Sequence, residues 1–354
     1  MITIGVDFSK RSSNYQIRDR NGQAIKRCKL INEPQRIAAF LDQLPGPKRL
    51  AMEATRNWGL YYETVKDHVD EFLLGHPRKM KQISESQTKY DAKDADLISQ
   101  MAYSGFFPKA HVSSLDTRQM RSLLHFRHFL VNQRKSIRNQ VQILLDRNLW
   151  PSQRPGSFKN PFCKKGCKWL QSLSLPVRER VILDQCLRNF ESLSQQIQEL
   201  EAFVETQSIE HPYLPFLRRI PGFQKSKVNA YIVIFEIENI HRFPKAKSFA
   251  HYAGLIPSEY SSGEKHRKGR LVKGANLFLR TAFIESTHAA IRRDRGLKLY
   301  YQSVKKRSGS SAAVIACARK LSYAVYHVIK NKTNYQPYQP STTTCHSSSV
   351  PQKG

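Results

Sequence analysis

Four carboxylates in the first hundred residues have types and positions that could hold metal ions. Asp7 closes a run of alternating β-prone residues, Glu53 closes a second short β-prone run, and Asp91 and Asp94 stand three apart on one face of a predicted helix. Carboxylates gathered in one place repel each other unless cations lie between them, and Mg²⁺ prefers hard oxygen ligands. We therefore predict a Mg²⁺ site with two ions, suited to phosphodiester chemistry. Taken singly, each acid also fits a solvated strand end or the acidic first turn of a helix.

A serine- and lysine-rich stretch near residue 265 could contact nucleic acid. Gly263, Gly269 and Gly274 let the backbone approach a phosphate closely, and Glu264 is the one acid among six basic residues. We predict nucleic-acid contacts by Lys265, Arg267, Lys268, Arg270 and Lys273. The alternative is a solvated lysine-rich surface. On sequence alone, Ser261-Ser262-Gly263 is typical of a flexible polar turn.

Net charge divides the chain unevenly. The 354 residues carry +30; 18 basic and 13 acidic residues precede residue 110, a net charge of +5, and the remainder carries +25. Such a surplus opposes compaction unless a polyanion neutralises it, so nucleic acid is the first partner to consider. The six cysteines show no paired framework, no apolar run approaches the roughly 18–20 residues of a membrane span, and the N-terminus lacks a signal-peptide pattern. We expect a cytoplasmic protein with no membrane partner.

The elements that must position the acids follow a recognisable order. Three β-prone stretches are followed by a helix, a strand, a helix, a strand and a helix that begins at Asp91. This is the β-β-β-α-β-α-β-α order of an RNase H-like α/β domain. In such a sheet the first and fourth strands are neighbours, so Asp7 and Glu53 should converge, and the last helix could bring Asp91 and Asp94 against them. Asp96 lies about 200° around that helix from Asp94 and is left out.

The rest of the chain reads as helical. Leu123, Leu130, Ile137 and Leu144 recur every seven residues, which predicts a long helix with a coiled-coil-like seam, and a second amphipathic helix runs from about 187 to 204. These helices should pair with each other or with those of another subunit. Two more helices are predicted over 276–291 and 311–329, in a mainly α C-terminal region. We predict a catalytic domain at 1–110, a helical coiled-coil region at 111–208, a C-terminal domain at 209–330 and a disordered tail at 331–354.

The residues around the acids resemble a known family. The motifs are Gly5-Val6-Asp7-Phe8-Ser9-Lys10, Met52-Glu53-Ala54-Thr55 and Lys89-Tyr90-Asp91-Ala92-Lys93-Asp94-Ala95. They resemble, in order, the DEDD motif of insertion-sequence transposases with a RuvC-like N-terminal domain, a family that includes Piv-type invertases and bridge-RNA-guided recombinases. Further motifs resemble the family's transposase domain: Phe243 to Ser248, Tyr252 to Pro257, Ser262-Gly263, Gly269 to Asn276, Leu279-Arg280 and Ala318 to Leu321. The resemblance covers about residues 2–330.

The resemblance implies a mechanism and partners. It implies that Asp7, Glu53, Asp91 and Asp94 bind Mg²⁺ and that Ser262 is the nucleophile that links to a DNA 5′ phosphate, with Ser261 the nearest rival. It also implies donor and target DNA as partners in the nucleoid, an element-encoded guide RNA, and a dimer or tetramer in which the acids of one subunit meet the serine of another. One departure concerns Ile220-Pro221-Gly222, because the second glycine that often follows in the family is absent here. A plain helix start near Pro221 explains that segment equally well.

Two other functions stay open on sequence alone. The chain could be a RuvC-like nuclease that hydrolyses branched DNA or RNA–DNA hybrids with the four acids and water, without a serine intermediate. It could also be a basic RNA-binding or scaffold protein without catalysis. Loss of a protein–DNA adduct on removing the Ser262 hydroxyl separates the first from a recombinase, and dependence on Asp7 separates the second from an enzyme.

Overall fold

The fold consists of two compact units in a computed structural model that describes residues 1–83, 91–224, 227–262, 265–272 and 274–339. By contacts the chain divides once, into Met1–Leu115 and Asp116–Gly354. The sequence predicts boundaries at 110 and 208. The residues of the predicted middle and C-terminal regions therefore share the second unit.

The first unit is built on a five-stranded mixed sheet of order β3-β2-β1-β4-β5. The strands are β1 (Ile2–Phe8), β2 (Ser12–Arg18), β3 (Ala24–Ile31), β4 (Lys48–Glu53) and β5 (Glu71–Gly75). β2 pairs antiparallel with both β1 and β3, whereas β4 pairs parallel with β1 and with β5. The predicted adjacency of the first and fourth strands is confirmed. Parallel strands end at the same edge of a sheet, so Asp7 and Glu53 come to that edge together.

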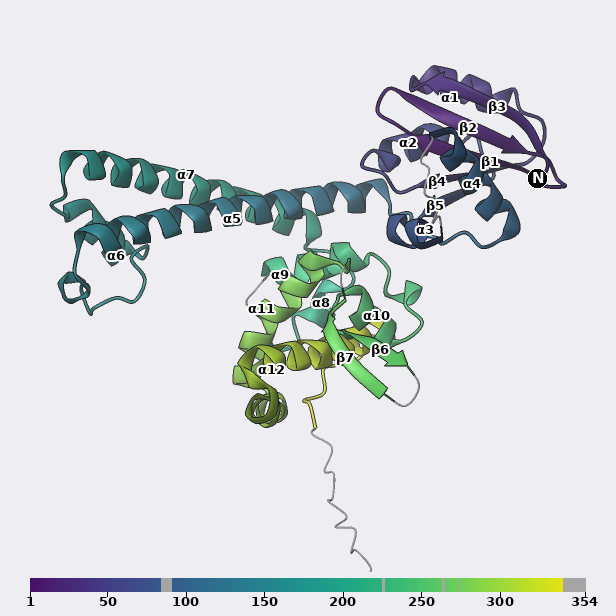
Figure 1. The fold of residues 1–354 in the computed structure, drawn as a ribbon. Coiled ribbons are helices and arrows are strands. Elements are labelled where there is room, and N and C mark those ends of the chain that lie inside the picture. Colours follow the sequence, from purple (N-terminus) through teal and green to yellow (C-terminus); the bar gives the residue numbers. More distant parts are fainter. Residues whose placement is uncertain (84–90, 225–226, 263–264, 273, 340–354) are drawn as a thin grey trace, which may run out of the picture. The chain divides into compact units, whose positions relative to one another are not determined.

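Helices cover both faces of this sheet (Figure 1). They are α1 (Pro34–Asp42), α2 (Trp58–Val65), α3 (Pro77–Ile83) and α4 (Asp91–Ser104). Because side chains alternate along a strand, each face has its own core: Val6 packs in one core with Phe40 of α1, and Ala51 packs in the other with Ile98 of α4. The observed order of elements adds α3 to the predicted order.

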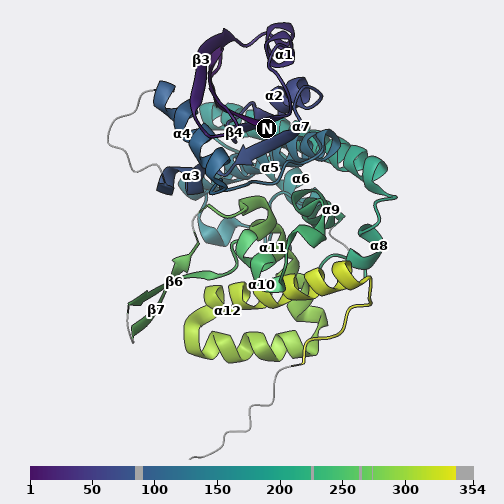
Figure 2. The ribbon, with the colours of Figure 1, turned by 90° about the vertical axis from the view of Figure 1, so that its right-hand side faces the viewer.

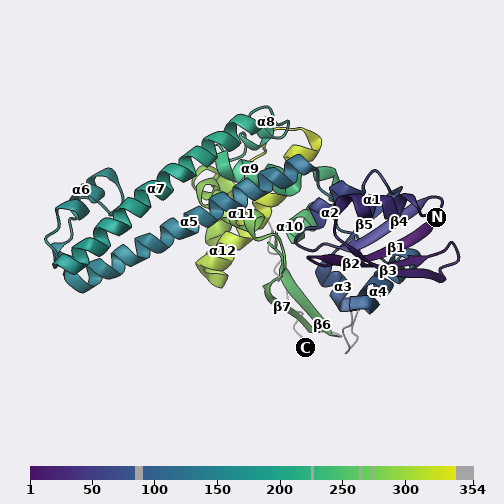
Figure 3. The same cartoon turned by 90° about the horizontal axis from the view of Figure 1, so that it is seen from above.

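The second unit begins with a long antiparallel helix pair, α5 (Leu115–Asn148) and α7 (Val177–Ser208). Leu130 packs in one cluster with Leu193, and Leu144 packs in another with Leu183, so the two helices run in opposite directions (Figures 1 and 3). Of the four predicted seam residues, Leu130, Ile137 and Leu144 lie in these clusters, and Leu123 packs against the larger core of the unit. The short 3₁₀ turn η1 (Pro151–Gln153) and α6 (Lys164–Ser172) connect the pair. Of the two pairings left open by the sequence, the one within a single chain is observed.

A helical core completes the second unit. Its elements are α8 (Leu214–Leu217), α9 (Lys227–Ile237), the 3₁₀ turn η2 (Ile240–Arg242), α10 (Ala246–Tyr252), α11 (Leu277–Arg293) and α12 (Arg295–Asn331). Every residue of α9 from Asn229 to Ile237 is buried, so this helix is the centre around which the others pack. Between α10 and α11 the chain forms a hairpin of β6 (Pro257–Ser262) and β7 (Lys265–Leu271), which extends away from the helices of its unit (Figures 2 and 3).

The last helix is broken at Gly309. This residue has φ +82° and ψ +169°, a conformation that glycine adopts readily, and the helix folds back on itself there (Figure 2). The part after the break matches the helix predicted over 311–329. The sequence predicts no apolar stretch of membrane-spanning length. Within the described residues, α12 is long and apolar enough to span a membrane by length and composition alone, but half of its apolar stretch is buried inside the protein.

The segment after α12 contacts the body of the second unit through Tyr335 and Tyr338. Tyr335 donates a hydrogen bond to Asp294, and the Tyr338 ring lies 5.3 Å from that of Tyr300. The prediction of a disordered tail from residue 331 therefore does not hold for these residues, because their aromatic rings find partners on the body of the unit. Residues 340–354 lie outside the described residues.

Candidate active site and nucleic-acid interface

Asp7 and Glu53 share one face of the first unit's sheet. The parallel register pairs Gly5 with Ala51 and Val6 with Met52, so the next pair along is Asp7 with Glu53. Side chains two apart on a strand share a face, so Asp7 lies on the face of Gly5 and Glu53 on that of Ala51. Both acids are partly buried. The backbone alone therefore brings two of the four predicted acids together.

Helix α4 lies directly on this face. A Cβ atom added at Gly5 would clash with the carbonyl oxygen of Ala95 and would lie 2.5 Å from the backbone nitrogen of Ser99. The backbone of α4 thus touches β1 two residues before Asp7. Asp94 precedes Ala95 in the first turns of this helix and is exposed.

Two further acids of α4, Asp91 and Asp96, lie near Asp94 in the sequence. Asp91 is the first residue of α4, and its side chain lies outside the described part of the structure. Asp96, left out of the predicted cluster, accepts hydrogen bonds from Arg18 of β2 and from Gln100. Its role in the structure is to hold α4 against the sheet.

The chemistry of this edge partly fits a divalent cation. Two buried polar atoms beside Glu53, the Thr55 hydroxyl and the Nδ1 atom of His76, have no hydrogen-bond partner among the described residues. His76 directly follows Gly75, which is the register partner of Glu53. Paired carboxylates with unsatisfied polar atoms nearby suit a hydrated hard cation. Among the side chains that the structure describes, however, no three acids, histidines or cysteines gather into a metal-binding group.

The predicted serine and basic residues lie on the β6–β7 hairpin. Ser262 is the last residue of β6 and pairs with Lys265, and Ser261 pairs with His266, so both serines lie next to the turn. The backbone of β7 carries four of the five predicted nucleic-acid contacts: Lys265, Arg267, Lys268 and Arg270. The side chains of the two serines and these four residues, and all of Lys273, lie outside the described residues. The backbone therefore places the serines and the basic strand on one hairpin.

The base of the hairpin is fixed by a close contact between Gly254 and Arg280. Gly254 has φ +66°, and a Cβ atom there would lie 2.8 Å from Nε of Arg280. The same guanidinium donates a hydrogen bond of 2.9 Å to the carbonyl of Val272, just after β7. Both residues belong to the motifs that carry the family resemblance. Their structural role is to tie the end of β7 to α10 and α11.

A buried carboxylate that the sequence reading missed supports the same region. Glu236 is 4% exposed, and its two oxygens lie 2.7 Å from Nε2 of His125 and 2.5 Å from Nδ2 of Asn276. Asn276 also caps α11 by accepting from the backbone of Leu279. Burial alone would raise the pKa of the Glu236 carboxyl, but hydrogen bonds from His125 and Asn276 and the nearby charge of Arg121 outweigh it and lower the pKa. This network joins α5, α9 and the start of α11. Its one sequence signal is a lone acid inside the apolar run 230–237.

The segment Ile220-Pro221-Gly222 belongs to the core of the second unit. Ile220 and Phe223 are fully buried, and the segment forms a turn between α8 and α9. No helix starts at Pro221, since α9 begins at Lys227. The alternative reading of a helix start is therefore wrong.

Acids at the ends of parallel strands, together with a basic hairpin, are typical of enzymes that act on nucleic-acid backbones. Residues 4–149 match a family model for DEDD transposases of the IS110 type, described as "Transposase". Residues 214–302 match the model described as "Transposase IS116/IS110/IS902 family". The chain belongs to the DEDD insertion-sequence transposases of this family, and it is a DNA transposase.

Curated relatives support the assignment over most of the chain. A "Probable family 20 transposase" of Pseudomonas aeruginosa is 22% identical over 338 residues, which span 94% of this chain and 98% of the relative. The "Transposase for insertion sequence element IS1111A" of Coxiella burnetii is 22% identical over 301 residues, 81% of this chain and 79% of that protein. An "Insertion element IS110 uncharacterized 43.6 kDa protein" of Streptomyces coelicolor is 24% identical over 162 residues, which span 46% of this chain and 40% of that protein.

Proposed function

We propose that this transposase cuts and rejoins DNA with two groups of residues on separate units. Asp7, Glu53, Asp91 and Asp94 hold divalent metal in an RNase H-like, RuvC-like first unit, and Ser262 on the hairpin is the nucleophile. The main support for the metal-binding role of the acids is the position of Asp7 and Glu53 on one face of adjacent parallel strands. The sheet order with the first strand between an antiparallel and a parallel neighbour supports the RuvC-like assignment.

The acids would hold Mg²⁺, as two ions, through their carboxylate oxygens. Bound Mg²⁺ would stabilise negative charge on the phosphate oxygens of the reacting DNA. The protein's own contribution is a rigid sheet edge that keeps Asp7 and Glu53 in register and a helix that holds Asp94 close by.

The strand-cutting step is a transesterification. The Ser262 oxygen forms a bond to phosphorus, the bond from phosphorus to the 3′ oxygen breaks, and the DNA 5′ phosphate becomes a serine phosphodiester. Ser262 loses one proton and the leaving 3′ oxygen gains one, so the step needs no oxidant or water. Rejoining reverses it with the 3′ hydroxyl of a new strand. The basic residues of β7, with Lys273, would bind the flanking phosphates.

A trapping experiment tests the nucleophile. DNA labelled next to the cut should form a covalent adduct with the full-length protein, and Ser262→Ala should abolish that adduct. Ser261→Ala is the matched control, because it lies one residue away on the same strand and should retain the adduct. Loss of the adduct in Ser261→Ala alone would move the role to Ser261. Cutting without any adduct would favour the alternative, a RuvC-like nuclease that uses water.

A second experiment tests the acids. Asp7→Asn and Glu53→Gln should abolish cutting while leaving DNA binding within about twofold, because the basic surplus lies in the second unit. Retained cutting in both variants would contradict the acidic site, whereas DNA binding without cutting by the wild-type protein would leave a binding protein as the better description.

The oligomer and the guide are further parts of the proposal. We infer a dimer or tetramer in the cytoplasm, on nucleoid DNA, with an element-encoded RNA that selects sites by base pairing; the family resemblance and the +25 remainder support this. Mixing Asp7→Asn chains with Ser262→Ala chains tests the subunit arrangement. If acids of one subunit meet the serine of another, a random mixture of dimers should regain about a quarter of wild-type activity. No recovery after co-refolding would place both groups in one chain.

A further inference from the structure

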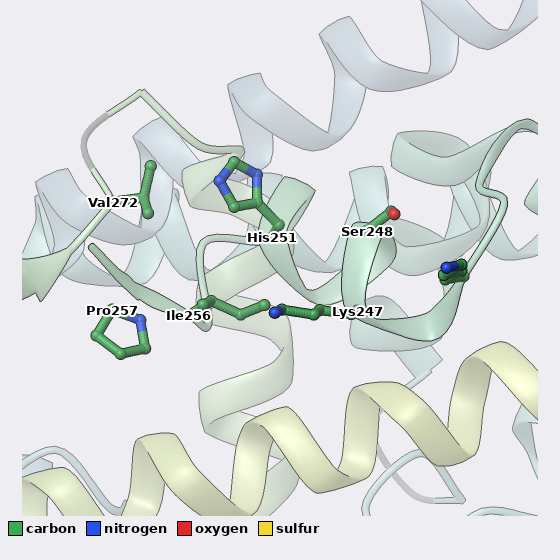
Figure 4. A pocket seen from close by; sticks show the side chains of 7 residues that line it. Lys247, Ser248, His251, Ile256, Pro257 and Val272 are labelled. Atoms are coloured by element: carbon green, nitrogen blue, oxygen red, sulfur yellow. The ribbon is translucent and has the colours of Figure 1, made fainter. Parts of the chain in front are cut away.

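A groove at the base of the β6–β7 hairpin has no part in the chemistry above. Its volume is about 590 Å³, within the range of sites that hold small organic ligands. The lining residues come from α10, the strand β6 and the segment after β7: Lys245, Lys247, Ser248, His251, Ile256, Pro257 and Val272. Figure 4 shows Lys247 and Ile256 extended toward each other, with His251 and Val272 facing the same space.

The groove combines a basic rim with an apolar floor. Lys245, Lys247 and His251 are exposed, whereas Ile256 is 7% exposed and Val272 is half-buried. Within the part of the chain that the structure describes, neither lysine has an ion-pair partner, and no acid lines the groove. A rim of this kind attracts an anion, and a floor of this kind favours a flat apolar group. A nucleotide carries both, in its phosphate and its base.

The walls of the groove are held in place before any ligand arrives. Tyr326 donates hydrogen bonds to the carbonyls of Phe243 and Pro244, directly before Lys245. On the opposite wall, Arg280 donates to the carbonyl of Val272. Because hydrogen bonds from residues of the core hold both walls, the groove is preorganised, which lowers the entropy cost of binding.

Its place on the hairpin sets its distance from Ser262. Pro257 and Ser262 are the first and last residues of β6, so at about 3.3 Å per residue they are roughly 16 Å apart. With bases spaced about 3.4 Å along a stacked strand, this distance corresponds to about five nucleotides.

We propose that this groove binds one nucleotide of the DNA strand that Ser262 attacks, about five positions from the joined phosphate. The phosphate lies between Lys245, Lys247 and Ser248, and the base leaves the stack to rest on Ile256, Pro257 and Val272 beside His251. Flipped bases are held in this way, between apolar and aromatic side chains. The proposal rests on the proposed function for the position of the cut.

Charge favours a DNA strand over the other candidates. A helix or loop of a protein partner would need acids to match the rim, and a neutral small molecule would leave both lysines unused. The substrate of a transposase supplies phosphates and bases together, and the hairpin that carries the basic strand leads directly into the groove.

The test uses full-length protein and a DNA substrate with 2-aminopurine placed singly at positions three to seven from the joined phosphate. The fluorescence of this base rises when it leaves the stack. We expect a severalfold rise at one of these positions, and its loss in the double variant Lys245→Gln/Lys247→Gln and in His251→Ala. The double lysine variant should also reduce the slope of log K against log salt by about 0.9, from the loss of one neutralised phosphate. Lys305→Gln/Lys306→Gln on α12 is the matched control, with the same change of charge on exposed residues, and should keep the fluorescence rise.

Each result decides the proposal separately from the function of Ser262. A fluorescence rise in a wild-type protein that cuts DNA without forming an adduct would support the groove and overturn Ser262 as the nucleophile. A normal adduct with no rise at any position, or with the Lys245/Lys247 variant indistinguishable from the α12 control, would overturn the groove. A rise only when the labelled strand is RNA would also overturn the DNA assignment.

Discussion

Replacing Gly5 with alanine tests the contact on which the acidic site depends. A methyl group at this position meets the backbone of α4, the carbonyl of Ala95 and the nitrogen of Ser99, and neither is the end of a flexible side chain that could turn aside. Overpacking of a closed core costs about 1–3 kcal/mol, and a clash with backbone on two sides belongs at the upper end of that range. We therefore expect a loss of about 3 kcal/mol in the stability of the first unit. For a unit of 115 residues this corresponds to a fall in Tm of about 12 °C.

The measurement must isolate the first unit, because a chain with two units need not unfold in one transition. Hydrogen exchange followed by mass spectrometry reports on β1 and α4 separately from the second unit. Gly5→Ala should speed exchange in both elements and reduce DNA cutting, since α4 carries Asp94, while DNA binding is retained. Gly156→Ala is the control, because a Cβ atom there meets nothing within 4 Å. If Gly5→Ala matched this control in exchange and in Tm to within 1–2 °C, the packing of α4 on β1 described above would be wrong.

Three further predictions concern single residues. The pKa of Glu236 is lowered in the folded state, so its negative charge stabilises the fold at pH values above the ordinary pKa of 4.5, and this stabilisation is lost as the pH falls through the lowered pKa. Glu236→Gln should therefore reduce the free energy of unfolding by about 2 kcal/mol in denaturant titrations at pH 7. The same cost at pH 3 would refute the assignment. Asp96→Asn should lower the Tm of the first unit yet retain metal-dependent cutting at reduced temperature. Asp94→Asn should keep the Tm and lose metal-dependent cutting. Identical behaviour of the two variants would count against separate roles. Gly254→Ala should cost about 2 kcal/mol or more, because it combines a left-handed backbone with a clash against Arg280, and nuclear magnetic resonance should show shifts along β7 that a purely local effect would not produce.

The sequence was sufficient to predict the acidic edge because strand order follows from the order of elements. The order of elements matches that of an RNase H-like domain, in whose sheet the fourth strand pairs with the first, so Asp7 and Glu53 meet without any knowledge of side-chain packing. The helix seam was readable for the same reason, since Leu130 and Leu144 repeat at a helical period. The role of Ser262 was predicted only from the family resemblance, because a Ser-Ser-Gly turn has no local signal of chemistry, and the strands β6 and β7 beside it were not predicted.

Features that depend on distant partners were not predictable. Glu236 and His125 are 111 residues apart, and neither residue type nor spacing indicates that they will share a hydrogen bond. Helix α3 (Pro77–Ile83) is short and basic, with too few apolar positions to show a period. The groove could not be predicted from the sequence, because Lys245 and Lys247 resemble ordinary surface residues and the opposite wall comes from the segment after β7.

Several motif residues that the second unit shares with the family fix the position of the β6–β7 hairpin. Gly254, Arg280 and Asn276 all make buried or partly buried contacts near the base of the hairpin, while Ser262 lies at its far end. A hairpin anchored at one end and extended at the other can hold DNA near its base and present a nucleophile at a set distance along the same strand. Variants at the base should then change where the cut falls or how fast it forms, without removing the nucleophile. If Ser262 is the nucleophile, the strands of the hairpin would set the distance between the groove at the base and that serine, and Gly254, Arg280 and Asn276 would serve by holding the base in place.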